Sequence, residues 1–266
     1  MNDALFTRIK SLPPLPQSVV KIQQICNDPN SSISDMTKVI EQDPMLTANI
    51  LKAANSPLYG FSRAIKTLGQ AVSLFGMATV RGFTVAGVIK STLPIDLSPY
   101  KMSADKFADL SQLQNALMVR WYSQISRPML EILSPASFLS GVGRLIMAQE
   151  IIKTGKRDDF INKALANGHA AAEMEFFGVS YQEVSAAIFR HWLFESEMVE
   201  AIGGSVDPAS VSEVIRPYAF ALKIVQTAVT IPGGVTEEAV EAAAKVVESA
   251  NGSIEVFKKA AMAFLQ

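Results

Sequence analysis

The stretch Glu41 to Gly60 reads EQDPMLTANILKAANSPLYG, and it holds the start, the apolar face and the end of one helix. Asp43 followed by Pro44 is typical of a helix N-terminus. The carboxylate can accept first-turn amide protons, and proline suits the first helical position. The apolar residues at helical spacing after this start are Leu46, Ile50 and Ala54. The pattern predicts a helix that buries one face.

The end of this helix is predicted at Asn55-Ser56-Pro57, because the residue before a proline disfavours helical backbone. The side-chain amide of Asn55 can bond the open carbonyl groups of the last turn. Tyr59-Gly60 then indicates a turn whose aromatic ring packs back on the helices. A purely structural role could therefore explain the residues from Glu41 to Gly60, without any ligand.

Residues typical of helix starts and ends recur along the chain. The alternation of apolar and polar residues that is typical of strands is nearly absent, so we expect an all-α fold. Capping boxes are predicted at Ser32/Asp35, Thr67/Gln70 and Ser180/Glu183. Further helix starts are expected at Ser103, Ser134-Pro135, Asp158-Asp159, Asp207-Pro208, Thr236 and Ser253. Pro217 is expected inside the helix that begins at Asp207-Pro208, where it would kink or divide that helix.

Glycine pairs suggest how the chain is organised. Gly203-Gly204-Ser205 is the best soft boundary, and Ile231-Pro232-Gly233-Gly234 is a weaker one. We expect a main domain at residues 1–204 and a smaller C-terminal helical lobe at residues 205–266. The lobe would pack on the main domain, and the two could form one continuous domain.

Composition argues against a disordered chain, a membrane protein and a general nucleic-acid binder. The hydrophobic share is 49% and the charged share 18%, so the chain should fold compactly. The formal net charge is -1, which gives no general drive toward nucleic acid or an anionic membrane. Its single cysteine, Cys26, fits a small buried side chain and a reducing cytosol. No membrane partner and a cytoplasmic location are expected, and nucleic-acid binding is a minor alternative.

The two histidines offer little for a metal site. His169 with Glu173, and His191 with Glu195, each lie four residues apart and could supply two ligands from one helix face. Two ligands do not make a catalytic centre, and neither pair has another histidine to recruit. His191 continues the spacing of an apolar stripe, which is typical of a core or boundary residue. His169 is expected near the surface.

Nucleophilic and phosphate-loop signals are also weak. Ser140-Gly141-Val142-Gly143 lacks the pattern of a nucleophile elbow. It also lacks the lysine of a phosphate-binding loop, and it follows a predicted helix rather than a strand. Close packing between helices is the simpler reason for Gly141 and Gly143. We therefore expect no catalytic residue, no metal ligand and no cofactor.

The N-terminal third holds an ordered set of segments: Leu12-Pro13-Pro14-Leu15-Pro16, Glu41 to Thr47, Leu51 to Gly60, Ala71 to Gly76 and Val80-Arg81. In this order they resemble the HDOD family, the HD-related output domains of bacterial signalling proteins. The resemblance covers residues 10–205 well and the helical tail more loosely. It implies a multi-helix, HD-like fold and a role in signal transduction.

The resemblance also shows where metal ligands would be expected. Relatives often read Phe-Leu-x-Gly-Leu-Leu-His-Asp-Ile-Gly-Lys-Leu where this chain has Phe138 to Leu145. The best match drops four residues after Gly141, including the His-Asp pair. Tyr181 stands where a second histidine often begins a helix, and Gly203-Gly204-Ser205 replaces a third histidine region. Tyrosine is a poor substitute for imidazole near pH 7, because its ordinary pKa is about 10.

The sequence therefore predicts a non-catalytic regulatory domain that acts by binding a signalling protein. A nucleotide-sensing domain that binds a cyclic dinucleotide is one alternative, and a metal-dependent phosphohydrolase is a disfavoured one. The candidate interaction residues are Asp43, Asn55, Ser56, Tyr59, Arg81 and Arg144. The two arginines are chosen because guanidinium groups suit bidentate contacts to phosphate.

Overall fold

The computed structural model describes residues 3–93, 95–231 and 233–265, and its fold is all-α with one short strand pair. The N-terminal elements are α1 (Asp3–Lys10), α2 (Gln17–Asn27), α3 (Ile33–Glu41), α4 (Pro44–Ala54), η1 (Pro57–Tyr59), α5 (Leu68–Phe75) and α6 (Met77–Thr92). The central elements are η2 (Ser98–Tyr100), α7 (Ala104–Tyr122), α8 (Leu130–Leu139), η3 (Ser140–Val142) and α9 (Gly143–Lys153).

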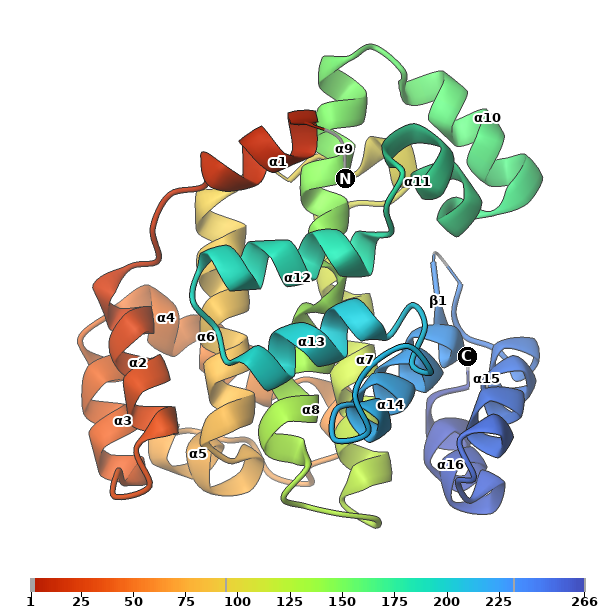
Figure 1. The fold of residues 1–266 in the computed structure, drawn as a ribbon. Helices are drawn as coiled ribbons and strands as arrows, with labels where there is room; N and C mark the ends of the chain where they lie inside the picture. Colours follow the sequence, from red (N-terminus) through yellow and green to blue (C-terminus); the bar gives the residue numbers. More distant parts are fainter. Residues whose placement is uncertain (1–2, 94, 232, 266) are drawn as a thin grey trace.

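The second half of the chain wraps around these central helices (Figure 1). It begins with α10 (Arg157–Asn167), α11 (His169–Phe177), α12 (Tyr181–His191) and α13 (Ser196–Gly204). It ends with α14 (Arg216–Ala228), β1 (Val229–Thr230), β2 (Gly234–Val235), α15 (Glu237–Ser249), α16 (Ile254–Ala261) and η4 (Met262–Phe264). Helices α12 and α13 cross in front of α6 and α8, while α10 and α11 project as an arm.

The centre of the fold is the packing of α8 on α6, α7, α13 and α14. Helices α6 and α8 approach closely because Gly82 has no side chain, and a Cβ there would lie 3.2 Å from the Cα of Pro135. The segment Leu130–Lys153 is long and apolar enough to cross a bilayer by length and composition. In the structure, 72% of its apolar window is buried by protein, as in the core helix of a globular fold.

Local capping signals were reliable predictors of helix starts. The capping boxes at Ser32/Asp35, Thr67/Gln70 and Ser180/Glu183 are all present. Asp43 caps α4, with its Oδ1 accepting the amide proton of Leu46 at 3.0 Å. The starts at Ser103, Thr236 and Ser253 are also confirmed, each by a side-chain cap, and α10 carries Asp158 and Asp159 in its first turn.

The predicted helix start at Ser134-Pro135 is wrong. Helix α8 begins at Leu130, and Pro135 lies inside it. The hydroxyl of Ser134 is engaged elsewhere, because it accepts a 2.8 Å hydrogen bond from Asn115 Nδ2 and shares a 2.7 Å hydrogen bond with Thr79. A serine that bonds to neighbouring helices gives the same sequence signal as a serine that caps its own.

The predicted helix start at Asp207-Pro208 is also wrong. Asp207 caps a turn, since its Oδ1 accepts from the amide of Ala209 at 3.3 Å and its carbonyl accepts from the hydroxyl of Ser210 at 2.7 Å. Helix α14 starts only at Arg216. Pro217 therefore lies in its first turn, where proline is tolerated, and it does not divide the helix as expected.

The C-terminal segment packs against the rest of the chain. Trp121 of α7 meets Phe257 of α16 with ring centroids 5.2 Å apart. Gln226 of α14 accepts hydrogen bonds from Gln182 and Ser205, each at 3.2 Å. The weak boundary near Ile231–Gly234 is the turn of an antiparallel pair in which Val229 faces Val235, and Pro232 lies outside the described residues. The division at residue 204 stays a prediction.

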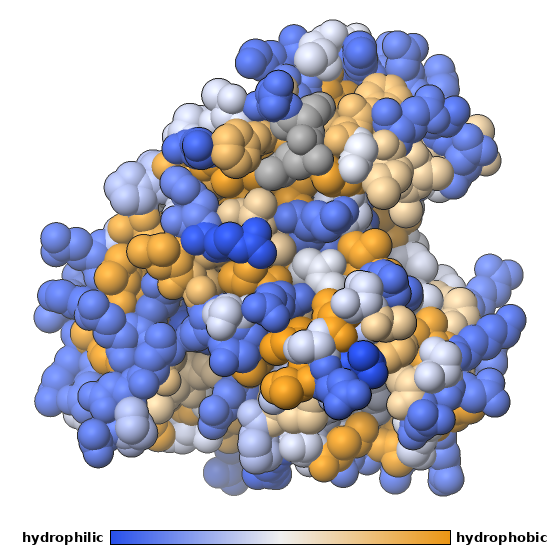
Figure 2. Space-filling model, viewed as in Figure 1, coloured by the Kyte–Doolittle hydropathy of each residue, from blue (hydrophilic) through white to orange (hydrophobic). Residues whose placement is uncertain are grey.

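The surface is mixed, with apolar atoms exposed over α13 and the connection that follows it (Figure 2). Val214 in that connection is 74% exposed. The outline is indented between the α10–α11 arm and the C-terminal helices (Figure 2). These features leave several candidate faces for a partner.

Leu193, in the turn after α12, combines exposure with an unfavourable backbone. Its side chain is 88% exposed and its φ is +58°. The amide of Phe194 bonds back to the carbonyl of Phe189 at 3.0 Å, which closes the helix end in a geometry that usually carries glycine. A leucine in this left-handed conformation has a steric cost that glycine would not have, and burial of its side chain does not offset that cost.

Replacing Leu193 with glycine is therefore expected to stabilise the protein, by about 0.5–1 kcal/mol, because the steric cost outweighs the added freedom of the unfolded chain. Urea unfolding followed by circular dichroism would measure this change. Leu165→Gly is the matched control, since Leu165 is 68% exposed within α10 and glycine there should cost about 0.5–1 kcal/mol. If both substitutions changed the free energy of unfolding in the same direction, the left-handed backbone at Leu193 would not be the source of a steric cost.

Candidate functional site

The predicted residues at the end of α4 hold a corner of the fold together. Asn55 Nδ2 donates to the carbonyls of Leu51 and Ile65, both at 2.8 Å, and its Oδ1 accepts from the amide of Ile65 at 2.8 Å. The expected bond to the last turn is confirmed. Ser56 precedes η1 and makes no side-chain cap there. The side-chain contacts of Asn55 are thus directed into the protein.

Tyr59 also turns inward from this corner. Its ring packs edge-on against Phe75, with centroids 4.6 Å apart, and its hydroxyl donates to Asn115 Oδ1 at 2.7 Å. Burial raises the pKa of Tyr59 well above its ordinary value. Asn115 in turn bonds the backbone carbonyl and the hydroxyl of Ser134, and Ser134 meets Thr79. A buried polar chain thus joins η1, α7, α8 and α6.

Arg81 lies on α6, beside a different set of groups. It is 4% exposed, and it forms an ion pair with Glu195, which lies at the start of α13. The two side chains line a cavity that also includes Cys26. Burial raises the pKa of the Cys26 thiol to about 11, so this cysteine is not an activated nucleophile.

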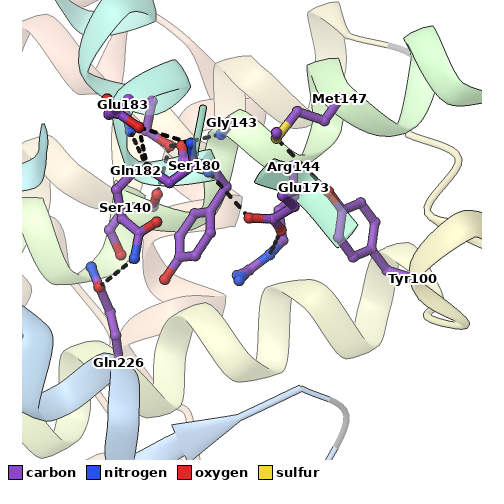
Figure 3. A network of polar contacts seen from close by, with 12 residues as sticks. Tyr100, Ser140, Gly143, Arg144, Met147, Glu173, Ser180, Gln182, Glu183 and Gln226 are labelled. Atoms are coloured by element: carbon purple, nitrogen blue, oxygen red, sulfur yellow. Dashed lines mark hydrogen bonds and ion pairs between the residues drawn. The ribbon is translucent and has the colours of Figure 1, made fainter. Parts of the chain in front are cut away.

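Arg144 is the centre of a separate, buried charged cluster. Its Nε donates to Glu173 Oε1 at 3.1 Å, and the Glu173 side chain has no exposed surface. The guanidinium carbon lies 3.3 Å from the ring centroid of Tyr181 and 5.8 Å from that of Tyr100. Figure 3 shows Glu173 between the helix of Arg144 and the ring of Tyr100. The cation therefore has one carboxylate and two aromatic faces as partners.

The Glu173 carboxylate links α11 to α12 as well as balancing the positive charge of Arg144. Its Oε2 accepts the amide proton of Tyr181 at 3.2 Å, so the carboxylate caps the open end of α12 from α11. Burial opposes the charge on Arg144, but the neighbouring tyrosines and Glu173 outweigh it and its pKa is raised. Burial, followed by Glu173, raises the pKa of Tyr100, while burial raises that of Tyr181. Arg144 is thus a permanent cation and both tyrosines stay neutral near pH 7.

Gly143 sets the distance between α9 and α12 at this cluster. A Cβ on Gly143 would lie 2.2 Å from the carbonyl oxygen of Tyr181, which is too close for any side chain. The amide of Gly143 donates to the hydroxyl of Ser185 at 2.8 Å. The helix-packing interpretation of this glycine is confirmed. The contact brings the residue that follows it, Arg144, beside the ring of Tyr181.

The two histidines lie apart from one another. His169 is half-buried, stacks on Tyr100 with centroids 5.5 Å apart, and has a lowered pKa because of burial and then Arg144. It therefore borders the charged cluster. His191 is exposed, and its predicted place in the packed stripe is wrong, because α12 ends at that residue beyond the buried part of the stripe.

No group of three or more histidine, cysteine, aspartate or glutamate side chains within residues 3–93, 95–231 and 233–265 is arranged to hold a metal ion. The Arg144 cluster itself consists of one cation, one carboxylate and two neutral tyrosine rings. The candidate residues fall in four places: the start of α4, which Asp43 caps, the α4–η1 corner, the Arg81 cavity and the Arg144 cluster. Sequence reasoning missed Tyr100 and Asn115, because no local pattern relates them to partners far along the chain.

Comparison with known families matches residues 12–208 to the HDOD domain. The chain belongs to the HDOD family. The HDOD match covers the α4–η1 corner, Arg81 and the Arg144 cluster, and it ends shortly after α13. The all-α, HD-like fold expected from the sequence is confirmed by solved structures.

Three solved structures resemble this HDOD protein along nearly its whole length. One is a virulence factor from Campylobacter jejuni subsp. jejuni, with 26% identity, a TM-score of 0.60 and coverage of 97% of this chain and 94% of that one. The second, provisionally named a phosphohydrolase, is from Shewanella amazonensis SB2B, with 21% identity, a TM-score of 0.69 and coverage of 98% and 94%. The third, provisionally named a signal transduction protein, is from Marinobacter aquaeolei VT8, with 21% identity, a TM-score of 0.67 and coverage of 98% and 64%.

A curated relative from Treponema pallidum (strain Nichols) is described only as an uncharacterized protein. It is 31% identical over 74 residues, which are 28% of this chain and 14% of that protein. The HDOD chain thus matches a small part of a longer relative. These comparisons establish the family and the fold, and they leave the activity to be argued from the site.

Removing the charge of Arg144 is expected to destabilise the protein strongly. Arg144→Met leaves the fully buried Glu173 carboxylate without its cation, which should cost about 3–5 kcal/mol of unfolding free energy. The double variant Arg144→Met/Glu173→Gln should recover much of that loss, because the amide is neutral and can still accept the proton of Tyr181. Urea unfolding of the single and double variants would measure both values.

Lys163→Met is the control for this comparison. It breaks an ion pair with Glu175 in which the two side chains are 35% and 54% exposed, so it should cost about 0–1 kcal/mol. If Arg144→Met were no more harmful than Lys163→Met, the cluster would not be a buried charge pair. If the double variant were as unstable as the single one, unpaired charge would not be the cause.

Proposed function

We propose that this HDOD domain acts without catalysis, as a regulatory domain that binds another signalling protein. The observation that carries the proposal is the Arg144 cluster. A guanidinium that is paired with a buried carboxylate lies beside Tyr181, the position where the family resemblance leads one to expect a histidine ligand. A guanidinium has no electron pair to donate to a metal ion, and Arg144 engages the Glu173 carboxylate of this cluster.

The cluster has a sufficient structural role of its own. Arg144 lies on α9, Glu173 on α11 and Tyr181 at the start of α12, so the three side chains join three helices. Buried charge is costly and is retained where partners compensate it. We infer that the centre is kept to fix the shape of a recognition scaffold rather than to bind a substrate.

The names of the structural relatives point to two functions, signal transduction and phosphohydrolysis. The charged cluster favours the first for this chain. Partner binding also accounts for Leu193, which is 88% exposed in a costly backbone conformation that glycine would relieve. Backbone strain is found most often at functional sites, so the positive φ of Leu193 supports a role for this turn in binding.

The catalytic alternative can be tested on purified protein prepared without chelator. We expect less than a stoichiometric amount of transition metal by elemental analysis, and no hydrolysis of a chromogenic phosphodiester above the rate of a heat-denatured sample. A stoichiometric metal that disappears in His169→Ala or His191→Ala would overturn the non-catalytic assignment. So would hydrolysis that depends on either histidine.

Partner binding can be tested by affinity capture from extract of the native cell, with quantitative mass spectrometry. We expect at least one signalling protein to be retained by the wild type and several-fold less by Leu193→Asp, because the charge would have to be buried at the interface. Leu165→Asp is the control and should retain it fully, since that leucine is also exposed. Failure to retain any signalling protein would contradict the adaptor role.

A further inference from the structure

A cavity lies where α1, α9 and the α10–α11 arm meet (Figure 1). Its volume is about 750 Å³, within the usual range for ligand pockets of roughly 300–1,000 Å³. The lining includes Ala4 of α1, Glu150 and Ile151 of α9, and residues of both helices of the arm. None of the candidate residues predicted from the sequence lines this cavity, so it is separate from the Arg81 cavity and the Arg144 cluster.

Glu150 brings a buried, unpaired charge to this cavity. The residue is 7% exposed, and its carboxylate takes part in no ion pair or hydrogen bond among residues 3–93, 95–231 and 233–265. The carboxylate oxygens are not among the unpaired polar atoms that protein covers completely, so they open onto the space that the residue lines. A buried carboxylate without a cation is costly to the free protein, and a positively charged ligand would relieve that cost.

The other charges of the cavity favour a ligand with one positive charge. Lys163 and Glu175 form an ion pair at 2.6 Å and offset each other. The remaining charged residues of the lining are Glu150 and Asp159, which are negative, and Lys156, which is positive. Two carboxylates beside one ammonium group leave a single negative charge in excess, and a cation is therefore attracted to the cavity.

A smaller cavity of about 360 Å³ adjoins the first at Glu150. Its charged lining residues, apart from Glu150, are Asp3, Arg8 and Lys153. Arg8 donates to the side-chain oxygen of Gln149, and Lys153 is exposed to solvent. These two cations near Glu150 disfavour a ligand with several positive charges, such as a polyamine.

Two aromatic side chains of α11 form an apolar wall of the larger cavity. Phe176 and Phe177 both line it, and Phe176 packs edge-on against Phe160 of α10, with ring centroids 5.4 Å apart. Aromatic rings pack against apolar groups, and their faces attract cations. The lining thus combines a carboxylate with aromatic surface, which suits an amine that carries an apolar group.

We propose that this cavity binds a small organic amine with one positive charge and an aromatic or aliphatic body. The ammonium group donates hydrogen bonds to the carboxylate of Glu150, and the body packs against Phe176 and Phe177. A charge-assisted hydrogen bond of this kind is stronger than a neutral one, so Glu150 supplies most of the selectivity for an amine. The site is distinct from the Leu193 surface proposed to bind a protein, and each assignment can fail without the other.

The binding test uses phenethylamine as the probe and isothermal titration calorimetry on the whole chain. Glu150→Gln is the main variant, because the amide keeps the size of the side chain and removes its charge. We expect at least about a tenfold loss of affinity. Asp159→Asn is the matched control, since it removes the same charge from an exposed carboxylate of the same lining, and it should lower the affinity by about threefold or less.

A neutral analogue separates the charge from the apolar body. Phenethyl alcohol has the same ring and chain without the ammonium group, so it should bind the wild type at least about tenfold more weakly than phenethylamine does. It should bind Glu150→Gln as well as it binds the wild type. The proposal is overturned if phenethylamine shows no saturable binding to the wild type at millimolar concentration, if Asp159→Asn loses as much affinity as Glu150→Gln, or if the alcohol binds as tightly as the amine.

Thermal unfolding without ligand tests the buried charge itself. Glu150→Gln should raise the Tm of the free protein by at least about 2 °C, because it removes an unpaired charge from a buried position. Circular dichroism would measure the shift for this variant and for Asp159→Asn, which should show no such rise. A lower Tm in Glu150→Gln would mean that the carboxylate has a partner in the free protein, and the proposal would then fail.

Discussion

The absence of a side chain at Gly143 lets α9 lie directly against the first turn of α12, and the charged centre of the protein depends on that contact. Any Cβ would overlap the carbonyl of Tyr181. The same approach places Arg144 over the ring of Tyr181 and within reach of Glu173 on α11. The close approach of α9 to α12 and the buried ion pair therefore depend on each other. If the two helices moved apart, Arg144 and Glu173 would separate or become exposed to solvent.

This constraint explains how the fold can persist where relatives are expected to have metal ligands. A metal centre cross-links helices through several side chains, and the Arg144–Glu173–Tyr181 cluster cross-links α9, α11 and α12 through hydrogen bonds and a cation–π contact. The two kinds of centre differ in how they can interact with a substrate. A catalytic metal ion keeps a coordination position open to substrate, whereas the guanidinium of Arg144 has no such position. Rigidity of this kind is what the proposed role as a recognition scaffold requires.

Sequence reasoning predicted the elements whose signals are local. The caps at Ser32, Asp43, Thr67 and Ser180 were confirmed because a cap and its target amide lie within three residues. The starts at Ser134 and Asp207 were wrong, since the same residue types served neighbouring helices or a turn. The site itself was only partly predictable, because Arg144 and Glu173 are 29 residues apart and Arg81 and Glu195 are 114 apart. Such pairings depend on helix packing, which no local pattern encodes.

The apolar segment from Leu130 to Lys153 leaves the ribosome before much of the structure that covers it. Helices α6 and α7 are already made at that point, but α13 and α14, which pack on α8, are still to be synthesised. During that interval a nascent chain exposes a long apolar helix of the length and composition that membranes and chaperones bind. Because the chain is made from its N-terminus, this apolar segment cannot be fully buried until α13 and α14 have been synthesised. In the folded protein, most of its apolar window is buried.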